Sequence, residues 1–240
     1  MILYWDFDGT LVHSGPLWST CLFRALQAVV PDSTLTLSDV RSHMAPGFPW
    51  ETPEQDSTKL VDERWWAYMN AHFFRSYLTL GLDPSQAQTA SRLVRALLLE
   101  PGNYILYPDC HETLAACVDR GYHNVLLSNN HPDLAHLMDA LGLAKYFEHF
   151  IISGEVGYDK PRAEIFALAN AYGPPGETRV MIGDSLTADI RGGNAAGMKT
   201  VLVHTPPSAE ADICISSLSA LLPAFDSEKI KEKIYGTVCG

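Results

Sequence analysis

Short apolar runs alternate with longer segments of helical periodicity along much of the chain. The apolar runs cover residues 2–7, 124–127, 149–153, 180–182 and 200–203, and small or polar residues close each of them. Brief apolar runs of this kind are typical of parallel strands that are buried on both faces. Helical patterns follow at 109–120, 132–141, 163–172 and 186–196. The alternation predicts an α/β fold built on a doubly wound parallel sheet.

Two further segments depart from this alternation. Residues 14–104 carry aromatic and aliphatic side chains at helical spacing, bordered by the breaker pairs Gly15-Pro16 and Pro101-Gly102. We interpret this stretch as an α-helical cap inserted into a core formed by residues 1–13 and 105–240. A short run at 213–215, followed by a helical stretch at 218–222, predicts one more strand at an edge of the sheet. The charged tail after Asp226 is expected to be peripheral.

Composition restricts the classes of function. Apolar residues make up 47% of the 240 residues, which is enough for a sizeable core, and the net charge of -11 argues against nucleic acid as a partner. The five cysteines are scattered without a Cys-x-x-Cys pair, so we expect neither a disulfide framework nor a zinc site. With no apolar run of spanning length and no signal-peptide pattern, we expect a cytoplasmic protein that does not enter a membrane.

The first motif, DFDGT at residues 6–10, follows the first predicted strand. Side chains two apart on a strand point to one side, so Asp6 and Asp8 can face one site. Crowded carboxylates repel each other unless a cation lies between them, which indicates a divalent metal ion. One carboxylate can attack while the other moves protons, and Gly9 permits a sharp turn beside them. The alternative is a pair of solvated acids at a turn.

Three later motifs also end predicted strands or leave loops. Ser128, followed by Asn129, stands where a strand meets a helix N-terminus, a position that suits an anion, although simple helix capping is the alternative. Lys160 precedes a proline, which would hold it at a loop exit, yet a lone lysine is usually a solvated charge. Asp184 and Asp189 fall at the carboxyl end of another strand, where open α/β sheets bind ligands. Capping does not readily explain four such sites in one chain.

Together the motifs, DFDGT, LLSNN, YDKP and GDSLTAD, resemble those of the haloacid dehalogenase superfamily in order and spacing. The resemblance implies a Rossmann-like core with strand order 5-4-1-2-3, and it implies that the insertion is the helical (C1) cap of that family. The second aspartate of the first motif favours the phosphatase type, because the dehalogenases of the superfamily lack it.

The resemblance also implies a role for each motif residue. Asp6 would attack phosphorus and form an aspartyl-phosphate, while Asp8 would protonate the leaving oxygen and then activate water. The remaining roles are Mg²⁺ binding by the side chains of Asp6 and Asp184 with the carbonyl of Asp8, phosphoryl binding by Ser128, Lys160 and the backbone of Asn129, and support from Gly9, Thr10 and Asp189. Cations of this kind would let an anionic nucleophile approach a phosphate dianion.

These observations predict a Mg²⁺-dependent phosphatase that acts on a small phosphorylated metabolite. A phosphomutase of the same superfamily and a non-catalytic binding protein that keeps the fold are the alternatives. Sugar phosphates, phosphoglycolate, nucleoside monophosphates and pyrophosphate all stay open as substrates. In the cap, His43, Phe48 and Trp50 are candidates for substrate selectivity, and packing of the cap core is the alternative for the two aromatic residues. His13, at the start of the cap, is either a hinge or a substrate contact.

Overall fold

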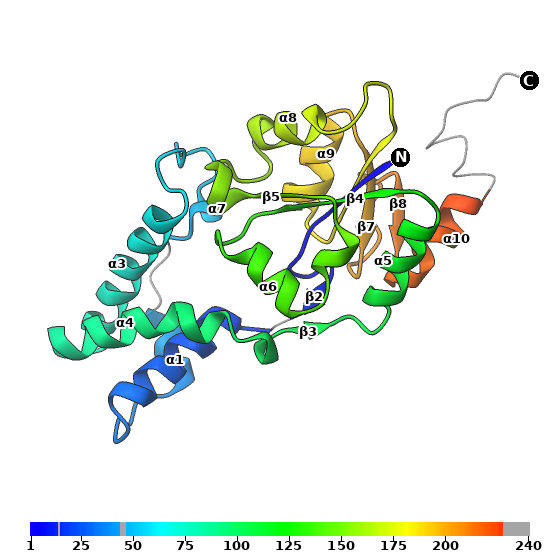
Figure 1. Cartoon of the computed structure of the whole chain (residues 1–240). Helices are drawn as coiled ribbons and strands as arrows, with labels where there is room; N and C mark the ends of the chain where they lie inside the picture. Colours follow the sequence, from blue (N-terminus) through cyan, green and yellow to red (C-terminus); the bar gives the residue numbers. More distant parts are fainter. Residues whose placement is uncertain (14, 44–46, 228–240) are drawn as a thin grey trace, which may run out of the picture.

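The computed structural model describes residues 1–13, 15–43 and 47–227 of the chain (Figure 1). A six-stranded parallel sheet forms its centre, in the order β5-β4-β1-β6-β7-β8. The strands are β1 (Ile2–Trp5), β4 (His123–Ser128), β5 (His149–Ile152), β6 (Arg179–Gly183), β7 (Lys199–Val203) and β8 (Ile213–Ile215). Numbered along the chain, the first five core strands lie in the predicted order 5-4-1-2-3, and β8 adds the predicted edge strand.

Helices cover both faces of this sheet, as continuous apolar strands require. Alternate residues of β1 point to opposite sides: Leu3 and Trp5 join one apolar cluster, while Ile2 and Tyr4 join another. The first cluster includes α5 (Cys110–Asp119), α6 (Leu134–Ala140) and α10 (Leu221–Asp226), and the second includes α8 (Ala163–Ala171). The short elements are η3 (Ala144–Tyr146), α7 (Ser153–Val156), α9 (Gly192–Ala195) and η5 (Leu218–Ala220).

Two predicted elements differ from those observed. The first strand ends at Trp5 rather than at residue 7, because the carbonyl of Phe7 accepts the N–H groups of Leu11 and Val12 at 2.8 and 3.2 Å and closes a turn. The predicted helix at 186–196 is a π-helical segment, η4 (Leu186–Arg191), followed by α9. One carbonyl, that of Ser185, accepts from the residues four and five positions later, which widens this turn.

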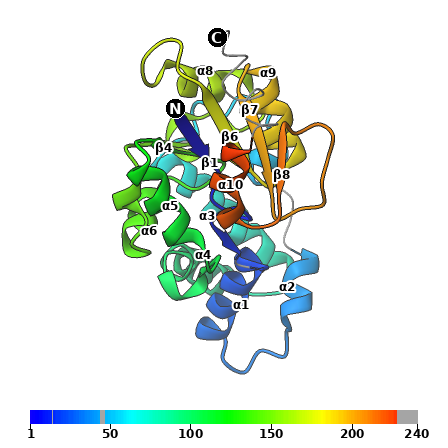
Figure 2. The same cartoon turned by 90° about the vertical axis from the view of Figure 1, so that its right-hand side faces the viewer.

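The predicted insertion after β1 is helical (Figure 2). It contains α1 (Leu17–Val29), α2 (Leu37–His43), η1 (Pro49–Glu51), α3 (Glu63–Thr79), α4 (Pro84–Leu98) and η2 (Pro101–Asn103). Helix α4 packs between α1 and α3, and the aromatic side chains of Trp65, Trp66 and Phe73 are buried there. The boundary of this cap at Ser14 and part of its loop, residues 44–46, lie outside the described residues, so the boundaries at 14 and 104 stay a prediction.

A small second sheet joins the cap to the core, and the sequence pattern did not predict it. Strand β2 (Val12–His13) pairs antiparallel with β3 (Ile105–Leu106), where the chain leaves the core and where it returns. Further along the cap, Arg95 of α4 forms two hydrogen bonds with Asp133 of the core, at 2.7 and 2.9 Å. These contacts hold the cap over the carboxyl ends of the strands.

Among the described residues, no helix combines the length and apolar character needed to cross a membrane. The charged tail that was expected to be peripheral lies outside the described residues beyond Ser227.

Candidate active site

The four sequence motifs meet at the carboxyl ends of the central strands. Asp6 directly follows β1, Ser128 is the last residue of β4, and Asp184 follows β6, the other neighbour of β1. Lys160 reaches the same place from the loop that follows α7. Because parallel strands end at a common edge, motifs more than 120 residues apart become neighbours.

Asp6 is the centre of this arrangement. Its Oδ1 accepts hydrogen bonds from the Ser128 hydroxyl and from the Lys160 ammonium, both at 2.9 Å. The same ammonium donates to Oδ1 of Asp189 at 2.6 Å, and Lys160 is buried. Burial by itself would lower the pKa of Lys160, but the charges of Asp189 and Asp6 outweigh it and raise that pKa. The lysine is therefore held as a cation beside the predicted nucleophile.

Three carboxylates form a cluster with the chemistry of a metal site. One oxygen from each of Asp6, Asp184 and Asp189 lies within 4.8 Å of the others. Burial, and then the charge of Asp6, raise the pKa of Asp184 to about 6. In the part of the chain that the structure describes, the cation in contact with this carboxylate cluster is the ammonium of Lys160, which pairs with Asp6 and Asp189. Oxygen ligands with an excess of negative charge suit a hard divalent cation, so this donor set fits a metal ion such as Mg²⁺.

Two glycines allow this crowding. Gly9 has a positive φ of 77°, and a Cβ at that position would collide with the carboxylate of Asp184. A Cβ at Gly183 would likewise collide with the carboxylate of Asp189. Thr10, the next residue of the first motif, donates from its hydroxyl to Oδ1 of Asp184 at 3.3 Å. Gly9 and Thr10 therefore shape the acid cluster, consistent with their predicted supporting position.

Asp8 is held by Asn130, a residue to which the sequence analysis gave no role. The side-chain amide of Asn130 donates to Oδ2 of Asp8 at 2.7 Å, and its own backbone bonds to Ser153 and Gly154. Asp8 is exposed to the pocket. The surrounding protein, which limits solvation of the charged form, and then the charge of Asp6 raise the pKa of Asp8 to about 7. A carboxyl group that titrates near neutrality can both donate and accept a proton.

Asn129 braces the loop of the lysine. Its side-chain oxygen accepts the backbone N–H of Lys160 at 2.6 Å, and its amide nitrogen donates to the carbonyl of Lys160 at 2.9 Å. The two polar residues after Ser128 were the only signal in the sequence for these contacts. The predicted contact between the backbone of Asn129 and a phosphoryl group stays a prediction.

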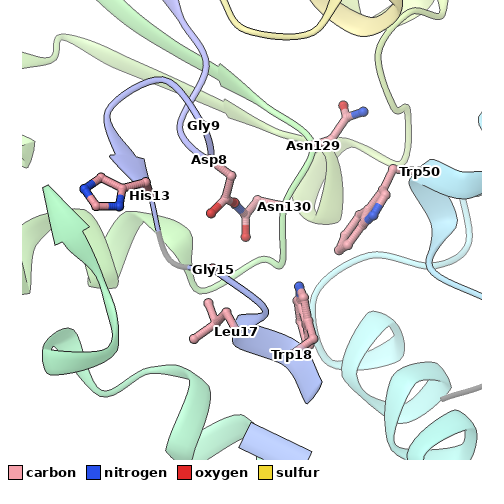
Figure 3. A pocket seen from close by; sticks show the side chains of 9 residues that line it. All are labelled: Asp8, Gly9, His13, Gly15, Leu17, Trp18, Trp50, Asn129 and Asn130. Carbon is pink, nitrogen blue, oxygen red and sulfur yellow. The ribbon is translucent and has the colours of Figure 1, made fainter. Parts of the chain in front are cut away.

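A pocket of about 430 Å³ opens beside Asp8 (Figure 3). Of the three cap residues predicted to select substrate, Trp50 lines this pocket, and His43 and Phe48 do not. Phe48 is buried and packs on the rings of Trp18 and Trp50, so it belongs to the cap core. His43 lies exposed on α2, where its ring bonds to the carbonyl of Asp39. His13 lies in β2 and also borders the pocket, so its position fits both predicted roles.

Comparisons with known proteins agree with this geometry. The family model described as haloacid dehalogenase-like hydrolase matches residues 2–197. A phosphoserine phosphatase of Thermus thermophilus is 36% identical over 138 residues, which is 55% of this chain and 55% of that relative's length. A glyceraldehyde 3-phosphate phosphatase of Pyrococcus furiosus is 32% identical over 242 residues, covering 97% of this chain and 95% of the relative.

Solved structures share the fold. The putative HAD-hydrolase YfnB from Bacillus subtilis, solved bound to magnesium, superimposes with a TM-score of 0.68 over 94% of this chain and 98% of that chain, at 20% identity. The family model covers most of this chain, and the motifs on which the resemblance rested meet at one site. The chain therefore belongs to the haloacid dehalogenase-like hydrolases.

Proposed function

We propose that this hydrolase is a Mg²⁺-dependent phosphatase that cleaves a small phosphorylated metabolite through an aspartyl-phosphate on Asp6. The observation that carries the proposal is the convergence of two donors, Ser128 and Lys160, on one oxygen of Asp6, with the raised pKa of Asp8 beside it. A phosphoryl group bound by the same two donors would lie next to the Asp6 carboxylate, which would then be placed to attack it.

In the first step, a carboxylate oxygen of Asp6 attacks phosphorus, and the bond from phosphorus to the leaving oxygen breaks. Protonated Asp8 donates its proton to that oxygen, so the alcohol leaves neutral. The donors on Ser128 and Lys160 pass from Asp6 to the phosphoryl oxygens, where they stabilise the charge that develops in the transition state.

In the second step, water attacks the phosphorus of the aspartyl-phosphate, and ionised Asp8 accepts a proton from it. The bond between phosphorus and the Asp6 oxygen breaks, which releases inorganic phosphate and restores the carboxylate. Mg²⁺ held by Asp6 and Asp184, with the carbonyl of Asp8, would offset the negative charge of the phosphoryl group. Asp189 keeps Lys160 oriented through their 2.6 Å contact.

The relatives support phosphate chemistry, because several are named as phosphatases. The magnesium-bound structure of a protein with the same fold supports the choice of metal. A pocket of about 430 Å³ suits a small molecule, and the acidic chain disfavours nucleic acid. The five cysteines are scattered and do not form a disulfide pattern, so we expect a reducing, cytoplasmic location.

Asp6→Asn tests the proposal, since it removes the attacking charge with little change in volume. We expect the release of inorganic phosphate, measured over a panel of phosphorylated metabolites with Mg²⁺, to fall by about 10⁴-fold, equivalent to about 5 kcal/mol of barrier. Asp139→Asn, at an exposed acid of α6, is the matched control and should retain activity. Activity of Asp6→Asn within about tenfold of wild type would refute the assignment. Isomerisation without phosphate release would identify a phosphomutase instead.

A further inference from the structure

The pocket beside Asp8 is the space that the leaving group of a phosphate ester must occupy. Ser128 and Lys160 bind the phosphoryl group on the Asp6 side, so the rest of the substrate extends past Asp8 into the cavity between core and cap. Figure 3 shows the side chains of Asp8, Trp18 and Trp50 directed toward this space from three different segments. The chemistry of the walls therefore selects the leaving group.

Apolar and aromatic side chains form the cap side of the wall. Trp18 and Leu17 come from α1, and Trp50 comes from η1. The rings of Trp18 and Trp50 lie 6.0 Å apart, centre to centre, and each packs on Phe48 behind them, at 4.8 and 4.9 Å. Because packing already fixes both indoles, a planar ring can stack on them with little further loss of side-chain entropy.

The polar part of the wall carries no positive charge from lysine or arginine among the described residues. It consists of Asp8, His13, Asn129 and Asn130, with two glycines. Asn130 already donates to Asp8, and Asn129 is bonded to the lysine loop. A second anionic group on the substrate would thus enter the pocket without a lysine or arginine partner there, which is unfavourable.

One cation of the cap, Arg41, lies beyond this wall. Arg41 lines a separate pocket of about 270 Å³ that shares Gly15, Leu17 and Trp18 with the first. The side chains of Leu17 and Trp18 therefore stand between Arg41 and the leaving group. On the other side of Trp50, a neighbouring pocket is lined by Glu51 and by Lys160. The ammonium of Lys160 is already bonded to Asp6 and Asp189 and is assigned to the phosphoryl group.

We propose that the substrate is a phosphate monoester with one phosphoryl group, whose alcohol part is uncharged and carries a planar ring. This inference rests on the proposed phosphatase function and narrows it. Of the substrate types that the sequence left open, phosphoglycolate and pyrophosphate each place a further anion beside Asp8 and are disfavoured. A nucleoside monophosphate, which combines a single phosphate with a neutral sugar and a planar base, satisfies the requirement.

The test compares esters that differ in the part that enters the pocket. The probes are 2-phenylethyl phosphate, ethyl phosphate, phosphoglycolate and 1,3-propanediol bisphosphate, each assayed for kcat/KM with Mg²⁺. We expect the phenylethyl ester to exceed ethyl phosphate by about 10- to 100-fold, the range of one apolar contact. Both anionic esters should fall below ethyl phosphate. An anionic ester that is cleaved faster than ethyl phosphate would overturn the inference.

Variants connect this preference to the wall. Trp18→Leu and Trp50→Leu should each lower kcat/KM for the phenylethyl ester by about tenfold more than they lower kcat/KM for ethyl phosphate. Tyr68→Leu, which removes an aromatic ring of α3 that does not line the pocket, is the matched control. His13→Lys, at an exposed position on the wall, should raise kcat/KM for the bisphosphate. Equal losses on both esters in the tryptophan variants would contradict a stacking role.

A binding measurement separates failure of this inference from failure of the proposed function. 2-Phenylethylphosphonate and phosphonoacetate cannot be hydrolysed, so calorimetric titration of each reports on the pocket alone. If no ester is cleaved, the phosphatase proposal fails. Tighter binding of the phenylethyl compound would then still support a pocket that binds an uncharged group with a planar ring. If phosphonoacetate binds more tightly, the inference fails, whatever the enzyme hydrolyses.

Discussion

Replacing His131 with phenylalanine should remove much of the sensitivity of this protein to mild acid. His131 is 1% exposed and lies among the rings of Trp18, Trp65 and Trp66, at the contact between cap and core. Neither ring nitrogen has a hydrogen-bond partner among the described residues. Burial lowers the pKa of His131 to about 4; of the charged groups beside it, Asp133 acts to raise this pKa and Arg95 to lower it.

The direction of the effect follows from where the proton binds. The pKa of a histidine in the unfolded chain is near 6.5, so between pH 6.5 and 4 the unfolded chain binds a proton at His131 and the folded protein does not. The contribution of neutral His131 to the free energy of unfolding is therefore complete above pH 6.5 and is lost as the pH falls toward 4. One unit of pKa corresponds to about 1.4 kcal/mol, so the loss is about 2 kcal/mol at pH 5 and about 3 kcal/mol near pH 4.

Urea unfolding of wild type and His131→Phe at pH 7.5, 6.0 and 5.0, in the presence of chelator, measures this difference. The free energy of unfolding of the variant should rise by about 2 kcal/mol relative to wild type between the first and last pH. Comparing the two proteins cancels the opposite contribution of Asp8 and Asp184, whose pKa values are raised. His136→Phe, at an exposed histidine of α6, is the control. Parallel pH profiles for wild type and His131→Phe would refute the reasoning.

Three further outcomes are expected. Asp8→Ala should reduce cleavage of alkyl phosphates much more than cleavage of p-nitrophenyl phosphate, whose leaving group needs no proton; equal losses would make Asp8 structural. Activity should vanish with a chelator, return with Mg²⁺ and be inhibited by Ca²⁺, which takes more ligands at longer distances; full activity in excess chelator would contradict the metal site. Phe48→Ala should lower the free energy of unfolding by about 3–5 kcal/mol, measured by urea. A free energy of unfolding within about 1 kcal/mol of wild type would contradict the place of Phe48 in the cap core.

Most of the core could be read from the sequence, because local patterns determine it. Uninterrupted apolar runs and the helical segments between them predict a parallel sheet, and parallel strands must end at one edge. That rule puts Asp6, Ser128 and Asp184 at strand ends, and the resemblance of their motifs to one family implied that they share a site. The edge strand Ile213–Ile215 followed from the same pattern.

Other features depend on contacts between residues that are distant along the chain. Strands β2 and β3 have two residues each, too few for any periodicity, and they form because the chain crosses between core and cap twice. The widened turn of η4 arises where Ser185 accepts two backbone N–H groups beside the buried Asp189. Local propensity carries no signal for either arrangement.

Tertiary contacts also decide the different roles of polar and aromatic residues that are neighbours in the sequence. Asn129 braces Lys160, whereas Asn130 holds Asp8, although the two asparagines are adjacent. Phe48 packs inside the cap, whereas Trp50 faces the pocket. The sequence by itself determined the sheet, the helical insertion and the set of charged residues that meet at the strand ends. Which side chain fills the cap and which one meets substrate was decided only by tertiary packing, because residue type and spacing do not specify the surface that a side chain will contact.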